Sequence, residues 1–424
     1  MSFHPRQLLI ICLLAGSRLL AQDMMNFTYR PHWPDHYSPT QHALSFSGEY
    51  NAGCDGVSNA FLNALYKGEY LDSSMKAPEE NRLLPSNRIG AYGSYGFSYS
   101  WRNRPDSLKW EFTLSARDRQ SLRGAFTSDA FRLGFEGNRP FRGATADLSG
   151  THLTYMRWQQ LQFECKYYTA DHLSEAAFGF SVLLGQQLQE INLREGKVFT
   201  ASNGTAVDIT SEASYYSSDT AHTQMFSRNG SGTCFNFRFS TIIGDSNARF
   251  HHQLFFSVQD LGYIRWDNNS LIYNVDTTLH YTGADASDVI VNHGNFTGIP
   301  DSDSLIGSPD EGQVIAFLPL GIRARYTLFT PWPWWAGVDL RIWSYADALP
   351  HVTLFAGWHD HNNKFNLSGG IAWGGYAGLQ VPLQLNYNPC KNFGITVGAV
   401  NLAAYVLPEK TTGQGAFANL SFAF

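Results

Sequence analysis

The sequence lacks any stretch of about 18 consecutive apolar residues, the minimum for a helix that crosses a membrane. Charged side chains are scarce as well: they make up 16% of the 424 residues, where about 25% is usual. The 30 basic residues are outnumbered by 36 acidic ones, and the net charge of −6 argues against a nucleic-acid partner. These deficits argue against a helical membrane protein and against a nucleic-acid-binding protein.

Catalytic and metal-binding patterns are also missing. The motif Gly-x-Ser-x-Gly of a nucleophile elbow does not occur. His359 and His361 offer metal-ligand types, but a polar turn explains them as well. We therefore expect no catalytic residue, no metal and no cofactor, and we expect that the protein is not an enzyme. The cysteines of the mature chain have no metal-type spacing, and their disulfide state stays open: they are Cys54, Cys165, Cys234 and Cys390.

The N-terminus carries the features of an export signal. Basic residues (His4, Arg6) precede an apolar run from Leu8 to Leu14, and a small residue, Ala21, stands where a signal peptidase would cut. The sequence thus predicts a signal peptide over residues 1–21 and a mature chain from Gln22. An exported chain without a helical anchor is periplasmic, secreted or an outer-membrane barrel.

Alternation of apolar and polar residues is what the mature chain has in abundance. From Leu108 to Arg117 every even position is apolar and every odd one is polar, a period that fits a strand and not a helix. The same pattern is clearest in residues 271–281. Further strands are predicted at 43–50, 91–101, 160–167, 175–187, 205–217, 235–240, 248–259, 318–328, 338–342, 351–358, 365–373, 379–387, 393–401 and 414–424.

These strands favour a transmembrane barrel over a soluble sandwich. Several keep their phase for ten residues or more, whereas strands of soluble proteins cluster near five or six. Aromatic residues, 15% of the chain, gather near strand ends, as expected for the girdles of such a barrel. The last strand ends on Phe424, a tail that resembles the signal read by the barrel assembly machinery of the outer membrane. The fold predicted is therefore all-β: one antiparallel barrel over residues 22–424, with about 14 strands (range 12–16).

Two stretches break the alternation. Residues 51–89 are predicted to form a short plug-like or inward-folded segment, with helical spacing between Ala60 and Arg82. A second helix is predicted from Ser128 to Phe135, with Ser128 as its N-cap. The long connection 282–315 is acidic and is interpreted as a solvated loop.

Three segments resemble a family of Bacteroidota outer-membrane barrels of uncharacterised function. They are Val258 to Trp266 (VQDLGYIRW), residues 81–99 with two Asn-Arg pairs, and residues 137–143. The family is similar in architecture to the long-chain fatty-acid transporter barrels. This resemblance implies about 14 strands, an N-terminal plug and a place in the cell outer membrane, in contact with its lipid.

Four charged residues lie on the polar phase of neighbouring strands and are predicted to line the lumen: Arg323, Arg325, Asp339 and Arg341. They form either an internal charge network or a selectivity lining. The function predicted is a channel or transporter for a small hydrophobic ligand. One alternative is a non-transporting membrane platform for envelope protein partners. Another is a secreted soluble sandwich that binds glycans through the tryptophans of residues 332–335.

Overall fold

The computed structural model describes residues 42–102, 110–169, 173–219, 222, 226–244, 249–281, 308–345, 347–362, 364–390 and 392–424. The predicted signal peptide (1–21), the start of the mature chain at Gln22 and most of the 282–315 connection lie outside these residues.

The strands pair antiparallel in one sheet that closes on itself, because the first strand pairs with both the second and the last. Fourteen strands of the described chain form the wall of this barrel. They are β1 (His42–Cys54), β2 (Ser86–Arg102), β3 (Trp110–Thr127), β5 (Thr151–Tyr168), β6 (Ser174–Thr200), β8 (Gly230–Ile243), β9 (His251–Trp266), β13 (Gly321–Phe329), β14 (Trp334–Trp343), β15 (Leu349–His359), β16 (Phe365–Gly375), β18 (Leu383–Cys390), β19 (Phe393–Ala399) and β20 (Gly413–Ala423). The short β17 (Ala377–Gln380) also pairs with β16. The predicted barrel is confirmed, and the soluble sandwich is wrong because a single closed sheet leaves no second layer.

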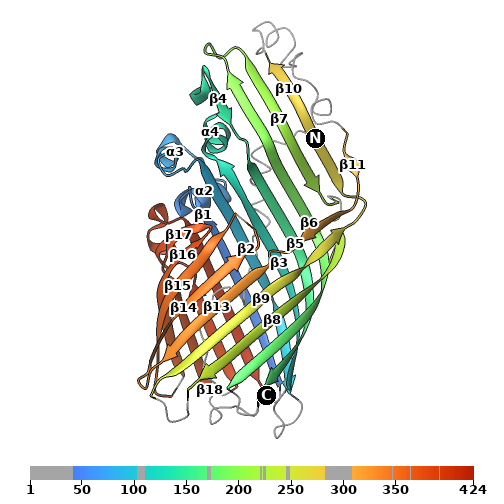
Figure 1. Ribbon diagram of the computed structural model, residues 1–424. Coiled ribbons are helices and arrows are strands. Elements are labelled where there is room, and N and C mark those ends of the chain that lie inside the picture. The colour runs from blue at the N-terminus through green and yellow to red at the C-terminus, as the bar shows by residue number, and fades with distance from the viewer. Residues whose placement is uncertain are drawn as a thin grey trace.

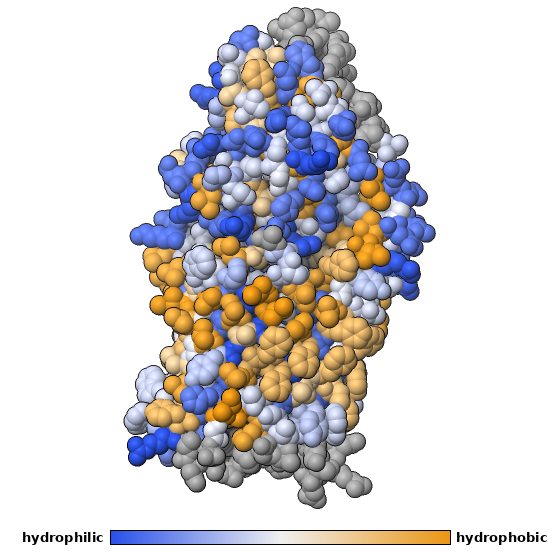
Figure 2. Space-filling view, viewed as in Figure 1, coloured by the Kyte–Doolittle hydropathy of each residue, from blue (hydrophilic) through white to orange (hydrophobic). Residues whose placement is uncertain are grey.

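The outer face of the barrel is apolar. Figure 2 shows hydrophobic side chains gathered in a band around its lower half. The band follows from the alternation, since residues of one phase are exposed on successive strands: among them are Phe46, Phe97, Leu114, Leu161, Phe163, Phe178, Phe180, Phe235, Phe237, Leu254, Phe256, Ile322, Leu340, Leu354, Ile371, Trp373, Leu420 and Phe422. Such a surface is stable only in lipid, so the barrel is embedded in a membrane. Among the described residues, no helix has the length and apolarity to cross a membrane.

Both ends of the described chain lie at one end of the barrel. His42 N donates to Phe424 O over 3.1 Å, and Phe424 N donates to His42 O over 2.9 Å. The helices lie at the opposite end, where the long connections run (Figure 1). They are α2 (Asn59–Lys67), α3 (Ser73–Glu80), α4 (Ser128–Glu136) and α7 (Ala403–Val406), with 3-10 turns η3 (Arg139–Phe141) and η4 (Pro408–Lys410).

The helices begin and end where local chemistry allows. The Ser58 side chain accepts a bond from Phe61 N at the start of α2, and Gly68 ends that helix with a φ of 70°, a conformation that glycine adopts without strain. At α4 the cap is Thr127, whose hydroxyl accepts a bond from Ala130 N over 3.1 Å. The prediction of Ser128 as the cap is therefore wrong by one residue, because Ser128 already lies in the first helical turn.

The predicted plug-like segment 51–89 needs a correction. Its first and last residues belong to β1 and β2, and only α2 and α3 are helical. Phe61 of α2 packs with Phe131 of α4, with Ile89 and with Phe126 in one buried cluster. Ile89 and Phe126 share the outward phase of their strands. The helices thus pack around the rim on its outer side, because that is where their apolar faces find apolar partners.

A sheet projects beyond the barrel at the same end (Figure 1). Strand β6 is 27 residues long, and its second half pairs with β7 (Val207–Ser217) and β4 (Ala144–Asp147). Strand β7 in turn pairs with β10 (Leu271–Tyr281). The predicted strand with the clearest alternation, residues 271–281, is therefore β10 and lies outside the barrel wall. Alternation shows that a strand has one apolar and one polar face, but it does not show which other strands pair with it. Two short strands, β11 (Asp310–Glu311) and β12 (Val314–Phe317), pair antiparallel with the ends of β10 and β9.

Candidate functional site in the barrel interior

The four residues predicted to line the lumen lie together on the inner face. Arg323 Nε donates to Asp339 Oδ2 over 2.6 Å, and Arg341 Nε donates to Asp339 Oδ1 over 2.9 Å. The Asp339 side chain is fully buried. Arg325 lies over the Phe255 ring, with its guanidinium carbon 4.8 Å from the ring centroid. One carboxylate thus anchors two arginines, with a third arginine close by, in a compact internal charge network.

A second charged cluster lies at the end of the barrel where the termini meet. The Glu111 carboxylate forms ion pairs with Lys166 Nζ at 2.9 Å and with Arg102 Nη2 at 2.6 Å. It also accepts a hydrogen bond from the Tyr168 hydroxyl over 3.0 Å. These residues were not among those predicted to line the lumen. The sequence did hold a sign of their inward position, since Glu111 and Lys166 lie on the polar phase of two predicted strands.

A third cluster joins two strands that lie four positions apart in the wall. Arg119 of β3 binds Asp260 of β9 through two parallel hydrogen bonds, of 2.5 and 2.6 Å. The same guanidinium donates to Gln160 Oε1 over 2.6 Å and to the Tyr92 hydroxyl over 3.0 Å. It also lies 5.0 Å from the ring centroid of Trp158. Both partners of the ion pair are buried, with 8% and 7% of their side chains exposed.

A β-bulge brings Asp260 to the inside. Phe237 pairs with Val258 and Phe235 with Leu261, so β9 holds two residues, Gln259 and Asp260, that have no such partner. Asp260 adopts a φ of 61°, a left-handed conformation that Asp tolerates better than most residues. The bulge lies in the segment 258–266 that carries the family resemblance. Its consequence is a change of phase: the exposed residues of β9 are even-numbered before it and odd-numbered after it.

Beyond the bulge, β9 contributes to an apolar cluster on the inner face. Its buried members are Met156, Trp158, Leu183, Leu188, Tyr216, Cys234, Ile264, Trp266 and Leu318. Trp158 pairs with Gly185, and Gly230 pairs with both Gly185 and Trp266, so one row crosses four strands. A Cβ atom on Gly185 would lie 2.9 Å from the Trp266 ring, and one on Gly230 3.1 Å from it. The two glycines therefore leave the space that the indole occupies.

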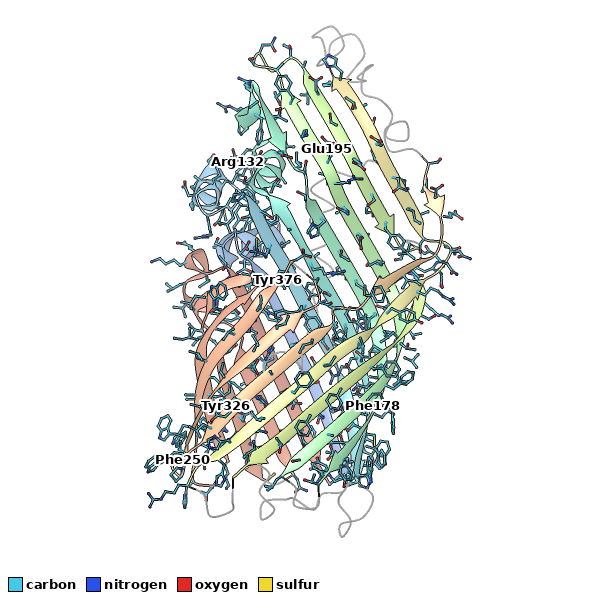
Figure 3. The ribbon with its side chains drawn as sticks, in the orientation of Figure 1. Arg132, Phe178, Glu195, Phe250, Tyr326 and Tyr376 are labelled. Carbon is cyan, nitrogen blue, oxygen red and sulfur yellow. The ribbon has the colours of Figure 1, made fainter. Side chains whose placement is uncertain are left out.

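Connections fold across the mouth of the barrel at the far end. Asp347, between β14 and β15, accepts a hydrogen bond from His152 Nε2 of β5 over 2.8 Å. Tyr345 of the same connection lies under the Arg123 guanidinium at 4.9 Å and stacks on Tyr376 with centroids 6.4 Å apart. Figure 3 places Tyr376 near this end of the barrel. Strands β3 and β5 lie several strands away from β14 and β15 in the barrel, so these contacts span the opening.

Metal-binding groupings do not emerge from the part of the chain that the structure describes. It holds no set of three or more His, Cys, Asp or Glu side chains arranged to bind a metal ion. All four cysteines in it are free thiols, with Cys54 and Cys234 buried. The thiol of Cys165 shares the outward phase of Leu161 and Phe163 on β5. The inner face of the described chain therefore carries ion pairs together with apolar clusters: the one described above and a second formed by Phe329, Trp335, Phe355 and Val400.

The sequence profile of a family of unknown function, DUF5723, matches residues 46–401. No curated protein matches the chain. Among solved structures, the P. putida toluene transporter TodX is 9% identical, with 91% of this chain and 89% of that chain covered and a TM-score of 0.43. The Ralstonia pickettii toluene transporter TbuX is 8% identical, with the same coverage and a TM-score of 0.42. The translocator domain of the autotransporter NalP from Neisseria meningitidis is 5% identical, covers 92% and 90%, and has a TM-score of 0.33.

Proposed function

We propose that this chain, which belongs to the DUF5723 family of unknown function, forms an outer-membrane channel or transporter for small hydrophobic molecules. The observation that carries the proposal is the apolar cluster around Trp158 and Trp266 on the inner face of the barrel. Barrels that pass water-soluble solutes have polar interiors. A fully buried aromatic and aliphatic cluster in such an interior favours an apolar cargo.

We interpret this arrangement as the closed state of the channel. The Arg119–Asp260 pair joins β3 to β9 beside the cluster, and the contacts of Asp347 and Tyr345 cross the mouth. Charged groups that are paired in this way present no free charge to a passing molecule. In this proposal, opening moves the mouth connections that carry Asp347 and Tyr345.

Uptake in whole cells tests the proposal. We would express the protein in a Gram-negative host and follow the accumulation of the apolar dye 1-N-phenylnaphthylamine and the hydrolysis of nitrocefin by a periplasmic β-lactamase. A hydrophobic channel raises dye uptake over an empty vector and leaves nitrocefin hydrolysis unchanged. If nitrocefin hydrolysis alone rises, the barrel is a water-filled pore. If neither changes while the barrel is folded, transport is refuted.

Folding of the barrel must be checked in the same cells. A closed barrel resists SDS until it is boiled, so the band should shift on heating. The double variant Trp158→Ala and Trp266→Ala removes the inner aromatic rings, whereas Trp334→Ala removes a ring that is 58% exposed on the outside. We expect loss of dye uptake in the first variant and not in the second.

A membrane platform for envelope protein partners is the second candidate. The sheet that projects beyond the barrel favours it. Within the described residues, β10 pairs with β7 along its whole length but pairs on its other edge only through Leu271 and Ile272. An open edge can add a strand from a partner. A cysteine at the exposed Thr278 would crosslink to one defined envelope protein in intact cells if this role is real, and to none if it is not.

Export and assembly belong to the same proposal. We infer that residues 1–21 are a signal peptide, that the outer membrane of a Bacteroidota cell is the destination, and that the strand ending at Phe424 is read by the barrel assembly machinery. Deletion of Phe424 should lower the amount of heat-modifiable protein in outer-membrane fractions. The proposal includes no catalysis and no cofactor.

A further inference from the structure

We propose that the inner apolar cluster binds a neutral small molecule that has an apolar body and one hydrogen-bond-accepting oxygen. The inference rests on the proposed function and adds the chemical class of the ligand. Its site is the row formed by Trp158, Gly185, Gly230 and Trp266, with Leu318 against it.

Two unpartnered donors point to such a ligand. The indole nitrogens of Trp158 and Trp266 are buried, and neither has a hydrogen-bond partner in the described part of the molecule. Both side chains are 0% exposed. A buried N–H without an acceptor is costly, and most such groups in folded proteins are satisfied. An acceptor on a bound molecule would satisfy them.

A third unpartnered group lies next to the row. Gln186 follows Gly185 at a bulge in β6, because Arg157 pairs with Gln187 while Trp158 pairs with Gly185. The Gln186 side chain is 0% exposed, and its amide oxygen and nitrogen both lack partners among the described residues. Two indoles and one amide are all uncharged, so they favour a neutral ligand.

The nearby charge does not favour an anion. Arg119 lies over Trp158, but its guanidinium already forms two bonds with Asp260 and further bonds with Gln160 and Tyr92. The positive charge is therefore compensated. A carboxylate at this site would meet the Asp260 charge and would have to displace it.

Leu318 is the side chain whose displacement we infer on ligand entry. It is the member of the cluster that lies outside the regular strands, in the break between β12 and β13. Its backbone N donates to Gly262 O over 3.0 Å, and its side chain is 3% exposed. The side chain of a residue outside the regular strands can change its rotamer while this backbone bond stays in place. Displacement of the Leu318 side chain would free space against the cluster.

Calorimetric titration of the purified full chain in detergent micelles, with a micelle blank, tests this ligand class. Three probes of similar size separate the alternatives: acetophenone has a neutral acceptor, ethylbenzene has none, and benzoate is an anion. One neutral hydrogen bond corresponds to a preference of about three- to tenfold. We expect acetophenone to bind more tightly than ethylbenzene by this factor, and more tightly than benzoate.

Variants identify the site. Trp266→Phe keeps a ring but removes the N–H, so acetophenone should bind only as well as ethylbenzene. Trp158→Phe should have the same effect, and Trp334→Phe, at an exposed position, should have none. Leu318→Ala leaves a cavity and should strengthen the binding of both uncharged probes. Heat-modifiability of each variant shows that it is folded.

The outcomes are separable. If the wild type does not distinguish acetophenone from ethylbenzene, if benzoate binds most tightly, or if both Trp→Phe variants bind acetophenone as the wild type does, the inference is wrong. If cells that express the protein take up the dye but calorimetry shows no preference among the three probes, only this inference is wrong. If cells show no dye uptake but acetophenone binds tightly in calorimetry, the transport function is wrong and the binding site stands.

Discussion

Removal of Asp260 should be among the most destabilising single changes in this barrel. Its carboxylate is the counter-charge of Arg119, which is buried with 8% of its side chain exposed. Breaking a buried ion pair by removing one partner costs about 3–5 kcal/mol, because the other charge stays buried without compensation. The φ of 61° adds roughly 1 kcal/mol when a residue with a Cβ and no local polar side chain replaces Asp.

A series of variants separates the two effects. Asp260→Ala loses the ion pair with Arg119 and also places alanine at an unfavourable φ, so its free energy of unfolding should fall by about 4–6 kcal/mol in total. Asp260→Gly keeps the backbone relaxed and should lose only the charge pairing. Asp260→Asn tolerates the same φ and keeps an acceptor for Arg119, so its loss should be the smallest of the three. The double variant Arg119→Met with Asp260→Asn removes the uncompensated charge and should recover most of the stability.

Urea unfolding in detergent micelles, read as the heat-modifiable fraction on gels, measures these differences. The reasoning fails if Asp260→Ala unfolds at the wild-type urea concentration. It also fails if the double variant is no more stable than Asp260→Asn, because the cost would then not arise from the buried charge of Arg119.

Three further predictions concern other parts of the molecule. Gly185→Val places a side chain where the Trp266 ring lies, which should lower the free energy of unfolding by about 1–3 kcal/mol through overpacking and change the tryptophan emission spectrum. Unchanged emission would contradict the close approach of the Trp266 ring to Gly185. Asp339→Asn removes the carboxylate that anchors Arg323 and Arg341 and should lower the urea midpoint without changing ion selectivity in planar bilayers; a selectivity change at unaltered stability would mean that the network is a lining for ions. Burial and the neighbouring Glu80 carboxyl raise the pKa of Glu136, so the α3–α4 contact is fully stable below the ordinary glutamate pKa and weakens as pH rises through the raised value. Hydrogen exchange of α3, corrected for intrinsic rates, should therefore accelerate from acidic to neutral pH in the wild type and not in Glu136→Gln.

Sequence reasoning was strongest where structure is local. The predicted strands at 43–50, 91–101 and 351–358 fall within β1, β2 and β15, and the helix predicted at 128–135 matches α4. The stretch 60–82, predicted to hold one short helix, holds two, α2 and α3. The alternation also placed four residues on one face of two neighbouring strands: Arg323, Arg325, Asp339 and Arg341. A period of two assigns side chains to opposite faces of a strand without knowledge of its neighbours.

Reasoning from the sequence was weakest where distant segments meet. Trp335, expected in an aromatic girdle, is buried with Phe329 and Phe355 on the inside. Two of the three internal charge clusters were missed because their members come from several strands. The pair of Arg119 and Asp260 joins residues 141 positions apart, and the bulge that turns Asp260 inward leaves no periodic signal.

The sequence by itself determined that this chain is a membrane barrel, because period-two alternation over long strands is a local property that only a sheet with one lipid-facing side can use. Tertiary structure decided which strands form the wall. It placed β10 in the projecting sheet, the helices on the outer rim, and the indoles of Trp158 and Trp266 in one inner row. Pairing and register across the whole chain fix those positions, and a single bulge shifts the phase of everything after it.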